Sequence, residues 1–161
     1  MPELIRNILV YIDGTEESVA AAQYAILLAD FAHAHLEALY VINTRALNDL
    51  VKTRIFLQEE QAEYQRDIEL DADKYLQHVQ NLGRSRGVTI DTIKRSGSIH
   101  QEIRRITEEH EIDLLVIGKI SRIRSRRDEI YDEAERAMRS VNCSVLVVKD
   151  EDRIWDLFER Q

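Results

Sequence analysis

The chain contains few cysteines, prolines and glycines, the residues that cross-link a fold, kink its elements or make its backbone flexible. Cys143 is the only cysteine among 161 residues, so no disulfide can form within the chain, and a reducing compartment such as the cytosol fits it best. One proline and five glycines argue against disorder and favour long regular elements. No apolar run approaches the roughly 18 residues of a membrane-spanning helix, and the N-terminal stretch has too short an apolar core for a signal peptide. We therefore expect a soluble, cytoplasmic protein.

Basic residues are outnumbered by acidic ones. Against 30 Asp and Glu there are 22 Lys and Arg, for a formal net charge of -8. Binding to a nucleic acid backbone depends on clustered basic side chains, so nucleic acid is not expected as the main partner. The length suits one domain, which at this size buries roughly two-thirds of the surface of its unfolded chain.

Apolar runs and amphipathic stretches alternate along the chain. The first run, Asn7–Ile12, is apolar almost throughout, the pattern of a strand that is buried on both faces. Further strands are expected at Leu36–Ile42, Val88–Lys94, Leu114–Ile117 and Val145–Val148. Five strands separated by helices predict an α/β fold, with a parallel sheet, right-handed crossovers and helices on both faces. The spacing alone leaves the strand order open.

The predicted helices carry recognisable end signals. Thr15 is the expected N-cap of the first helix. Gly83 and Gly87 are expected to end the long second helix. Ser98 followed by Gln101 predicts a capping box for the helix after the third strand.

An arginine-rich segment follows the fourth strand. Its basic residues are Lys119, Arg122, Arg124, Arg126 and Arg127, and its acidic neighbours are Asp128, Glu129, Asp132 and Glu133. This mixture favours a solvated surface on which the charges balance. An anion site or a patch for an acidic partner, made by the arginines from 122 to 127, stays open as the alternative.

Other residue constellations point to no particular chemistry. His33 and His35 sit at a helix-to-strand junction and the other three histidines fall on separate predicted elements, so no metal site is predicted. No Ser, His and Asp set is suggested by spacing, and no catalytic residue is named. Cys143 precedes a buried strand, a position typical of packing, with a reactive thiol as the lesser alternative.

Several stretches, taken in order, match a known family. They are ILVYIDGTEES at the first strand and its turn, the strand ending in Tyr40-Val41-Ile42, DLLVIG, and AERAMRSVNCSVLVV near the end. Through their order and spacing the chain resembles the universal stress protein family. The resemblance implies an open, Rossmann-like sheet of the adenine nucleotide alpha hydrolase-like type, with strand order 3-2-1-4-5. It also implies a cleft between strands one and four, lined by Asp13, Val41 and Gly118.

The nucleotide-binding branch of that family carries a pattern after the fourth strand: Gly, two residues, Gly, nine residues, Gly, then Ser or Thr. Laid on this sequence without a gap, the pattern falls on Gly118, Ser121, Tyr131 and Asp132, and only the first position matches. Side chains replace bare backbone at two positions, and a carboxylate replaces a hydroxyl donor at the last. Losing one hydrogen bond to a charged group costs roughly 1.5–3 kcal/mol. We therefore expect no cofactor.

The alternative is a retained site for ATP with magnesium. Its residues would be Asp13, Val41, Gly118, Lys119, Ser121 and Asp132. For Asp13, capping of the turn before the first helix is an equally good interpretation.

The fifth strand lies at the edge of the sheet in the family's strand order. An uncovered apolar edge is an association hazard, and in this family it commonly pairs with its copy across a two-fold axis. The edge residues are Val145, Leu146, Val147 and Val148. The resemblance therefore implies a homodimer.

After a domain spanning residues 1–150, residues 151–161 form a short amphipathic extension. Ile154, Leu157 and Phe158 are predicted on one helical face, with Trp155 beside them. Docking onto the protein's own dimer and a contact with another protein are the two alternatives.

These features predict a universal stress protein that acts as a dimeric regulatory or interaction protein in stress adaptation, without normal ATP binding. The first alternative is a stress sensor that binds ATP or another phosphorylated ligand between strands one and four. A slow ATPase is the second, and it is disfavoured because no positioned base or nucleophile can be named. The stress, the partner and any assembly beyond a dimer are not specified by the sequence.

Overall fold

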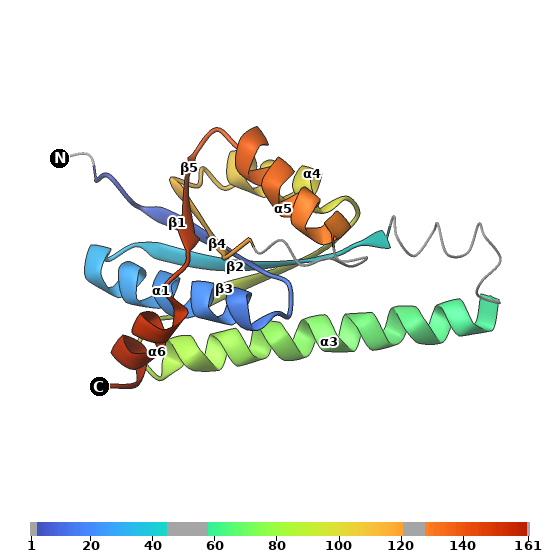
Figure 1. The fold of residues 1–161 in the computed structure, drawn as a ribbon, viewed down its shortest axis with the longest axis horizontal. Coiled ribbons are helices and arrows are strands. Elements are labelled where there is room, and N and C mark those ends of the chain that lie inside the picture. The colour runs from blue at the N-terminus through green and yellow to red at the C-terminus, as the bar shows by residue number, and fades with distance from the viewer. Residues whose placement is uncertain (1–2, 45–57, 121–127, 161) are drawn as a thin grey trace.

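The computed structural model describes residues 3–44, 58–120 and 128–160. Its centre is a five-stranded parallel sheet in the order β3-β2-β1-β4-β5, which lies between two groups of helices in Figure 1. The strands are β1 (Asn7–Ile12), β2 (His35–Ile42), β3 (Ile90–Ser96), β4 (Leu114–Gly118) and β5 (Ser144–Val148). This confirms the predicted fold class and strand order.

Helices cover both faces of the sheet (Figure 1). They are α1 (Glu16–Ala32), α3 (Gln58–Arg84), α4 (Ile99–Glu109), α5 (Asp128–Ser140) and α6 (Glu151–Glu159). One layer consists of α1, α3 and α6, and the other of α4 and α5. Within the described ranges, every helix is too short or too polar to cross a membrane.

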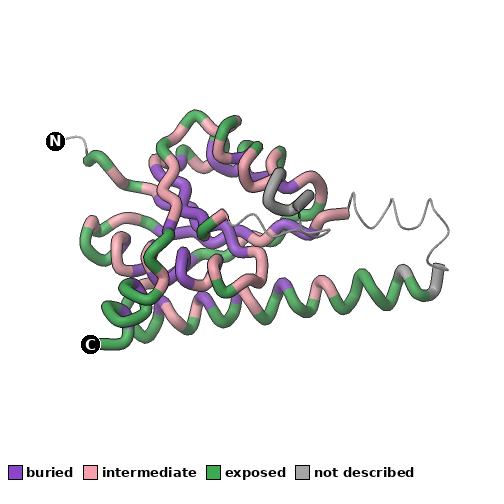
Figure 2. The backbone as a smooth tube through the Cα atoms, viewed as in Figure 1, coloured by how far each residue is buried: buried purple, intermediate pink, exposed green. Residues whose placement is uncertain are grey.

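The two faces of β1 supply two separate cores, because successive side chains of a strand point to opposite sides. Ile8 and Val10 pack with α1, α3 and α6, whereas Leu9 and Tyr11 pack with α4 and α5. Figure 2 shows these buried segments running through the middle of the molecule, while the far end of α3 is exposed. Burial on both sides explains why the run reads as continuously apolar.

Two predicted end signals are wrong, each for a packing reason. Gly83 lies inside α3, where an added Cβ would come within 2.7 Å of Ile90 Cδ1 and of the Val88 carbonyl oxygen. The helix therefore needs glycine there for its approach to β3, and the chain turns at Gly87, with φ of 73°. Ser98 occupies the N-cap position of α4 but makes no capping hydrogen bond with its side chain.

The first helix begins as predicted. The Thr15 side chain accepts a hydrogen bond from the Ser18 amide at 3.2 Å, which satisfies one of the free donors of the first turn. His33 closes the helix in the left-handed conformation, with φ of 53°.

The C-terminal extension forms α6 and packs on α1 of the same chain. Ile154 and Phe158 are 2% and 5% exposed, and the Arg86 guanidinium lies 5.3 Å from the centre of the Phe158 ring. Leu157, predicted on the same helical face as Ile154 and Phe158, is 45% exposed. Among the described residues, the buried side of α6 is that of Ile154 and Phe158.

Substitutions in α6 test this docking. Ile154→Ala should lower the free energy of unfolding by about 2–5 kcal/mol, because it empties a fully packed site. Leu157→Ala is the matched control and should change it by no more than about 0.5 kcal/mol. Urea denaturation followed by circular dichroism measures both. Equal losses in the two variants would contradict the described contact.

Candidate functional site

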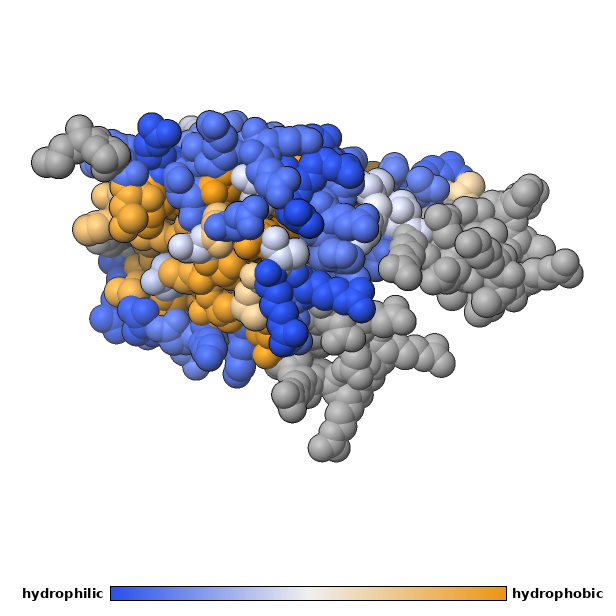
Figure 3. Space-filling view, turned by 90° about the horizontal axis from the view of Figure 1, so that it is seen from above, coloured by the Kyte–Doolittle hydropathy of each residue, from blue (hydrophilic) through white to orange (hydrophobic). Residues whose placement is uncertain are grey.

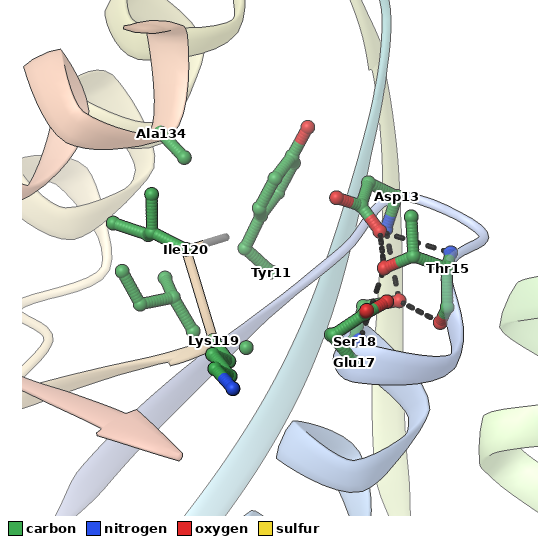
Figure 4. A pocket seen from close by; sticks show the side chains of 10 residues that line it. Tyr11, Asp13, Thr15, Glu17, Ser18, Lys119, Ile120 and Ala134 are labelled. Atoms are coloured by element: carbon green, nitrogen blue, oxygen red, sulfur yellow. Dashed lines mark hydrogen bonds between the residues drawn. The ribbon is translucent and has the colours of Figure 1, made fainter. Parts of the chain in front are cut away.

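The point at which the strand order reverses lies at the carboxyl ends of β1 and β4. Here β1 has β2 on one side and β4 on the other, and folds of this kind bind ligands at that position. A cavity lies there (Figure 4). It is lined by Tyr11, Asp13, Thr15, Glu17, Ser18, Ile117, Gly118, Lys119, Ile120 and Ala134.

Asp13 shapes the turn between β1 and α1. Its Oδ1 accepts hydrogen bonds from the Thr15 amide at 3.0 Å and from the Thr15 hydroxyl at 2.6 Å. The Asp13 amide in turn donates to Ser18 Oγ at 3.3 Å. The side chain therefore performs the turn-capping role that was one of its two interpretations, while still bordering the cavity.

Tyr11 lines this cavity and belongs to the core beneath α4 and α5. Figure 4 places its ring between the Asp13 turn and the side chains of Ile120 and Ala134, and the residue is 4% exposed. Burial, and then the charge of Asp13, raise the pKa of the Tyr11 phenol well above its ordinary value, so the group is neutral at physiological pH.

The remaining cavity is small. Its volume is about 20 Å³, close to what one water molecule needs. Pockets for drug-sized ligands hold several hundred Å³. Among the described residues, this cavity alone is too small for a nucleotide.

Gly118 is required by packing, whatever binds here. A Cβ at this position would lie 2.5 Å from the carbonyl oxygen of Glu17 and 2.6 Å from its carbonyl carbon. The first turn of α1 therefore rests directly against the end of β4. The one position that matches the nucleotide-binding pattern has a structural reason of its own.

The other predicted site residues are distributed as follows. Lys119 is exposed and lines the cavity. Val41 is 5% exposed, belongs to the core beneath α4 and is not one of the lining residues. Tyr131 and Asp132 belong to helix α5, so the last two positions of the pattern fall in a helix. Ser121 and the arginines Arg122, Arg124, Arg126 and Arg127 lie outside the described residues.

A histidine–carboxylate contact joins α4 to α5 next to Ala134. The Glu133 carboxylate accepts hydrogen bonds from the His100 ring at 2.5 Å and from the His100 amide at 3.0 Å. It thereby caps the start of α4, the task predicted for Ser98, whose hydroxyl lies 3.2 Å from the His100 ring instead. Burial works against ionisation of Glu133, but the His100 hydrogen bonds outweigh it and lower the pKa of Glu133.

Sequence reasoning missed Tyr11, His100 and Glu133. Tyr11 is the only hydroxyl-bearing residue in the run of β1, a signal that could have attracted attention. His100 and Glu133 are 33 residues apart, and nothing local marks them as partners.

A second, wider cavity lies between α1, α3 and α6, with a volume of about 420 Å³. Val19, Ala20, Leu82 and Trp155 contribute apolar surface to it, and Glu16, Glu151, Asp152 and Glu159 contribute acidic side chains. Burial, and then the charges of neighbouring carboxylates, raise the pKa of Glu151. This cavity is lined by no residue of the strand ends.

Cys143 lies just before β5 and is half-buried. Burial raises the pKa of its thiol, which lowers the thiolate fraction and with it the reactivity. The position favours packing over chemistry.

The edge strand β5 is only partly covered. Val145, Leu146 and Val147 are half-buried, while Val148 is 1% exposed. Seen from above in Figure 3, apolar side chains gather in one area between hydrophilic margins, toward the end of the molecule that carries the N-terminus.

An open parallel sheet with a cavity at its switch point defines a Rossmann-like α/β protein. The model of the universal stress protein family matches residues 4–149, and the chain belongs to that family. Universal stress protein MJ0531 of Methanocaldococcus jannaschii is 28% identical over 146 residues, which cover 91% of this chain and 83% of the relative.

Solved structures agree on the fold. Universal stress protein UspA from Lactobacillus plantarum superimposes with a TM-score of 0.70 at 23% identity, over 90% of this chain and 98% of that one. A universal stress protein from Archaeoglobus fulgidus in complex with dAMP superimposes with a TM-score of 0.63 at 12% identity, over 91% and 99%.

The Glu133 contact predicts a pH-dependent stability. Because the pKa of Glu133 is lowered in the folded protein, its ionised carboxylate stabilises the fold above the ordinary value of 4.5, and this contribution is lost as the pH falls through the folded-state pKa. Glu133→Gln should be less stable than the wild type at pH 7 by roughly 1.5–3 kcal/mol, the range for hydrogen bonds to a charged group. The difference should shrink in acid below pH 4.5.

Denaturant unfolding across this pH range measures the effect. Glu135→Gln is the control, because the Glu135 side chain is 42% exposed and should matter little at any pH. A constant difference between wild type and Glu133→Gln from pH 7 into acid would contradict the ionised contact.

Proposed function

We propose that this universal stress protein acts in the cytoplasm as a dimeric regulatory or interaction protein, without the ordinary ATP binding of the nucleotide-binding branch. The observation that supports the proposal is the small cavity at the switch point, which measures about 20 Å³ among the described residues and is lined by Tyr11 and Ile120. The carboxylate of Asp13 is engaged in its turn. Gly118 is needed for packing against α1.

A catalytic role is not part of the proposal. The described residues that line the cleft include no histidine and no cysteine, and their only carboxylates are Asp13 and Glu17. Asp13 already accepts two hydrogen bonds from Thr15. This set lacks the activated nucleophile and base that hydrolysis requires.

The second candidate is a nucleotide-binding sensor. One neighbour in fold was solved in complex with dAMP, and Lys119 offers a cation at the rim of the cleft. For this candidate Tyr11 would have to move aside. ATP with magnesium is the ligand to test, and the other proposed residues are Asp13, Val41, Gly118, Ser121 and Asp132.

Ligand-release and thermal-shift measurements separate the two candidates. The purified protein should release no stoichiometric nucleotide for mass spectrometry, and ATP with magnesium should leave its melting temperature unchanged. A ligand at about 100 times its Kd would add about 2.7 kcal/mol, and each kcal/mol raises the midpoint of a chain of this size by roughly 2–4 °C. Stoichiometric ATP, or a rise of that size, would contradict the proposal.

A gain-of-binding variant tests the physical reason. Ser121→Gly, Tyr131→Gly and Asp132→Ser, combined with Tyr11→Val, remove the side chains that we hold responsible and should create ATP-dependent stabilisation. The control combines the same three loop and helix changes with Tyr24→Val in α1, outside the cleft, and should show less of it. Circular dichroism establishes that both variants are folded.

The dimer is proposed to form through the edge of β5. In the part of the chain that the structure describes, the strand has a neighbour only on the β4 side, and its central valines and leucine are half-buried. A parallel edge of this kind pairs readily with another strand. Pairing across a two-fold axis would cover it on both copies.

Introducing a charged side chain at this apolar edge tests the dimer. Val147→Lys places a cation on the proposed contact and should yield a monomer in size-exclusion chromatography with light scattering. Phe31→Lys is the matched control, because Phe31 is 86% exposed at the end of α1 and its replacement should leave the dimer intact. A wild-type protein that stays monomeric at all concentrations would overturn the assembly.

A further inference from the structure

The starts of β2 and β3 bring together a group of metal-ligating side chains. The ligand atoms of His35, Glu37 and Asp91 all lie within 4.8 Å of one another. His35 and Glu37 are two residues apart on β2, so they share a face of the sheet. Glu37 pairs directly with Asp91 across the two parallel strands. The register of β2 and β3 brings these three side chains together, and this register cannot be read from the sequence.

Glu37 is the unusual member, because a carboxylate rarely occupies a strand interior at 9% exposure. Both of its oxygens lie within hydrogen-bond distance of His110 Nδ1, at 2.9 Å and 3.0 Å. The ring N–H at the end of α4 therefore holds the carboxylate in one orientation. Hydrogen bonds of this type from an outer residue typically orient the ligands of a metal ion.

The distances suit a small transition-metal ion. His35 Nε2 lies 3.1 Å from Asp91 Oδ2 and 3.8 Å from Glu37 Oε1. Zinc binds nitrogen and carboxylate oxygen at about 2.0–2.2 Å with tetrahedral geometry, which separates neighbouring ligand atoms by roughly 3.3–3.5 Å. These two separations bracket that value, and all three ligand atoms lie within 4.8 Å of one another. Rotations of the exposed His35 and Asp91 side chains around the buried Glu37 would complete the geometry.

The ligand types narrow the choice of ion. An imidazole nitrogen with two carboxylates suits zinc and related divalent transition metals, whereas magnesium and calcium prefer oxygen ligands alone. The side chains of His35 and Asp91 are 47% and 61% exposed, which leaves an open path for the ion and room for water as a further ligand.

We propose that His35, Glu37 and Asp91 bind one divalent transition-metal ion of the zinc type, with His110 as the residue that positions Glu37. This site lies at the amino ends of β2 and β3, whereas the candidate nucleotide cleft lies at the carboxyl ends of β1 and β4. It is therefore independent of the proposed function. It also differs from the expectation of no metal site, because the histidines and carboxylates meet only in three dimensions.

Calorimetric titration of the chelator-treated, full-length protein with Zn²⁺ tests the site. We expect saturable binding of one ion per chain. His35→Ala and Asp91→Asn should each weaken it at least about tenfold, a loss known even for residues outside the ligand set. Both side chains are exposed, so these variants should fold. His78→Ala is the control, since His78 is an exposed histidine on α3, and it should bind like the wild type.

Imidazole ¹⁵N spectra supply a second readout. On addition of Zn²⁺, the His35 ring resonance should shift while that of His78 stays in place. Absence of saturable binding, or equal affinities for wild type, His35→Ala and Asp91→Asn, would overturn the site. The cluster would then be a set of histidine–carboxylate ion pairs only.

Discussion

The arrangement at the switch point depends on the close approach of the first turn of α1 to the end of β4. Gly118 permits it, because any side chain would collide with the Glu17 backbone. The approach draws the Asp13 turn against the sheet and leaves Tyr11 pointing into the narrow space beyond it (Figure 4). In nucleotide-binding proteins a glycine at this position lets the backbone approach a phosphate. Here Gly118 is needed for the packing of α1 against β4, so its presence is not evidence for a bound ligand.

A histidine–carboxylate contact holds helix α4 at each of its two ends. At its start His100 meets Glu133 of α5, and at its end His110 meets Glu37 of β2. Carboxylates of low exposure are costly without partners, and here one helix supplies both partners. Its two histidines thus tie the second helical layer together and to the sheet, and the same tie at its end orients the proposed metal ligand Glu37.

Family membership and function rest on different kinds of evidence in this chain. The family is established by the match over residues 4–149 and the fold by the sheet and its neighbours. The fold alone supports many activities, so function has to be argued from the site. At that site Tyr11 and Ile120 line a small cavity, and the Asp13 carboxylate accepts hydrogen bonds from Thr15. For this reason the proposed function relies on the surfaces of the protein, including the edge of β5, and not on a bound triphosphate.

The strands, the helices and the Thr15 cap could be predicted from local sequence patterns. The spacing of apolar residues along a segment shows which of its faces are buried, and therefore whether it forms a strand or a helix. The strand order came from resemblance and agrees with the structure. The Ser98 capping box was wrong because a carboxylate 35 residues away reaches the same helix end. The sequence by itself determined the layers of this protein. Only the tertiary structure decided that Tyr11 lines the cleft and that His35, Glu37 and Asp91 meet, because strand register and helix placement set those contacts and no local pattern encodes them.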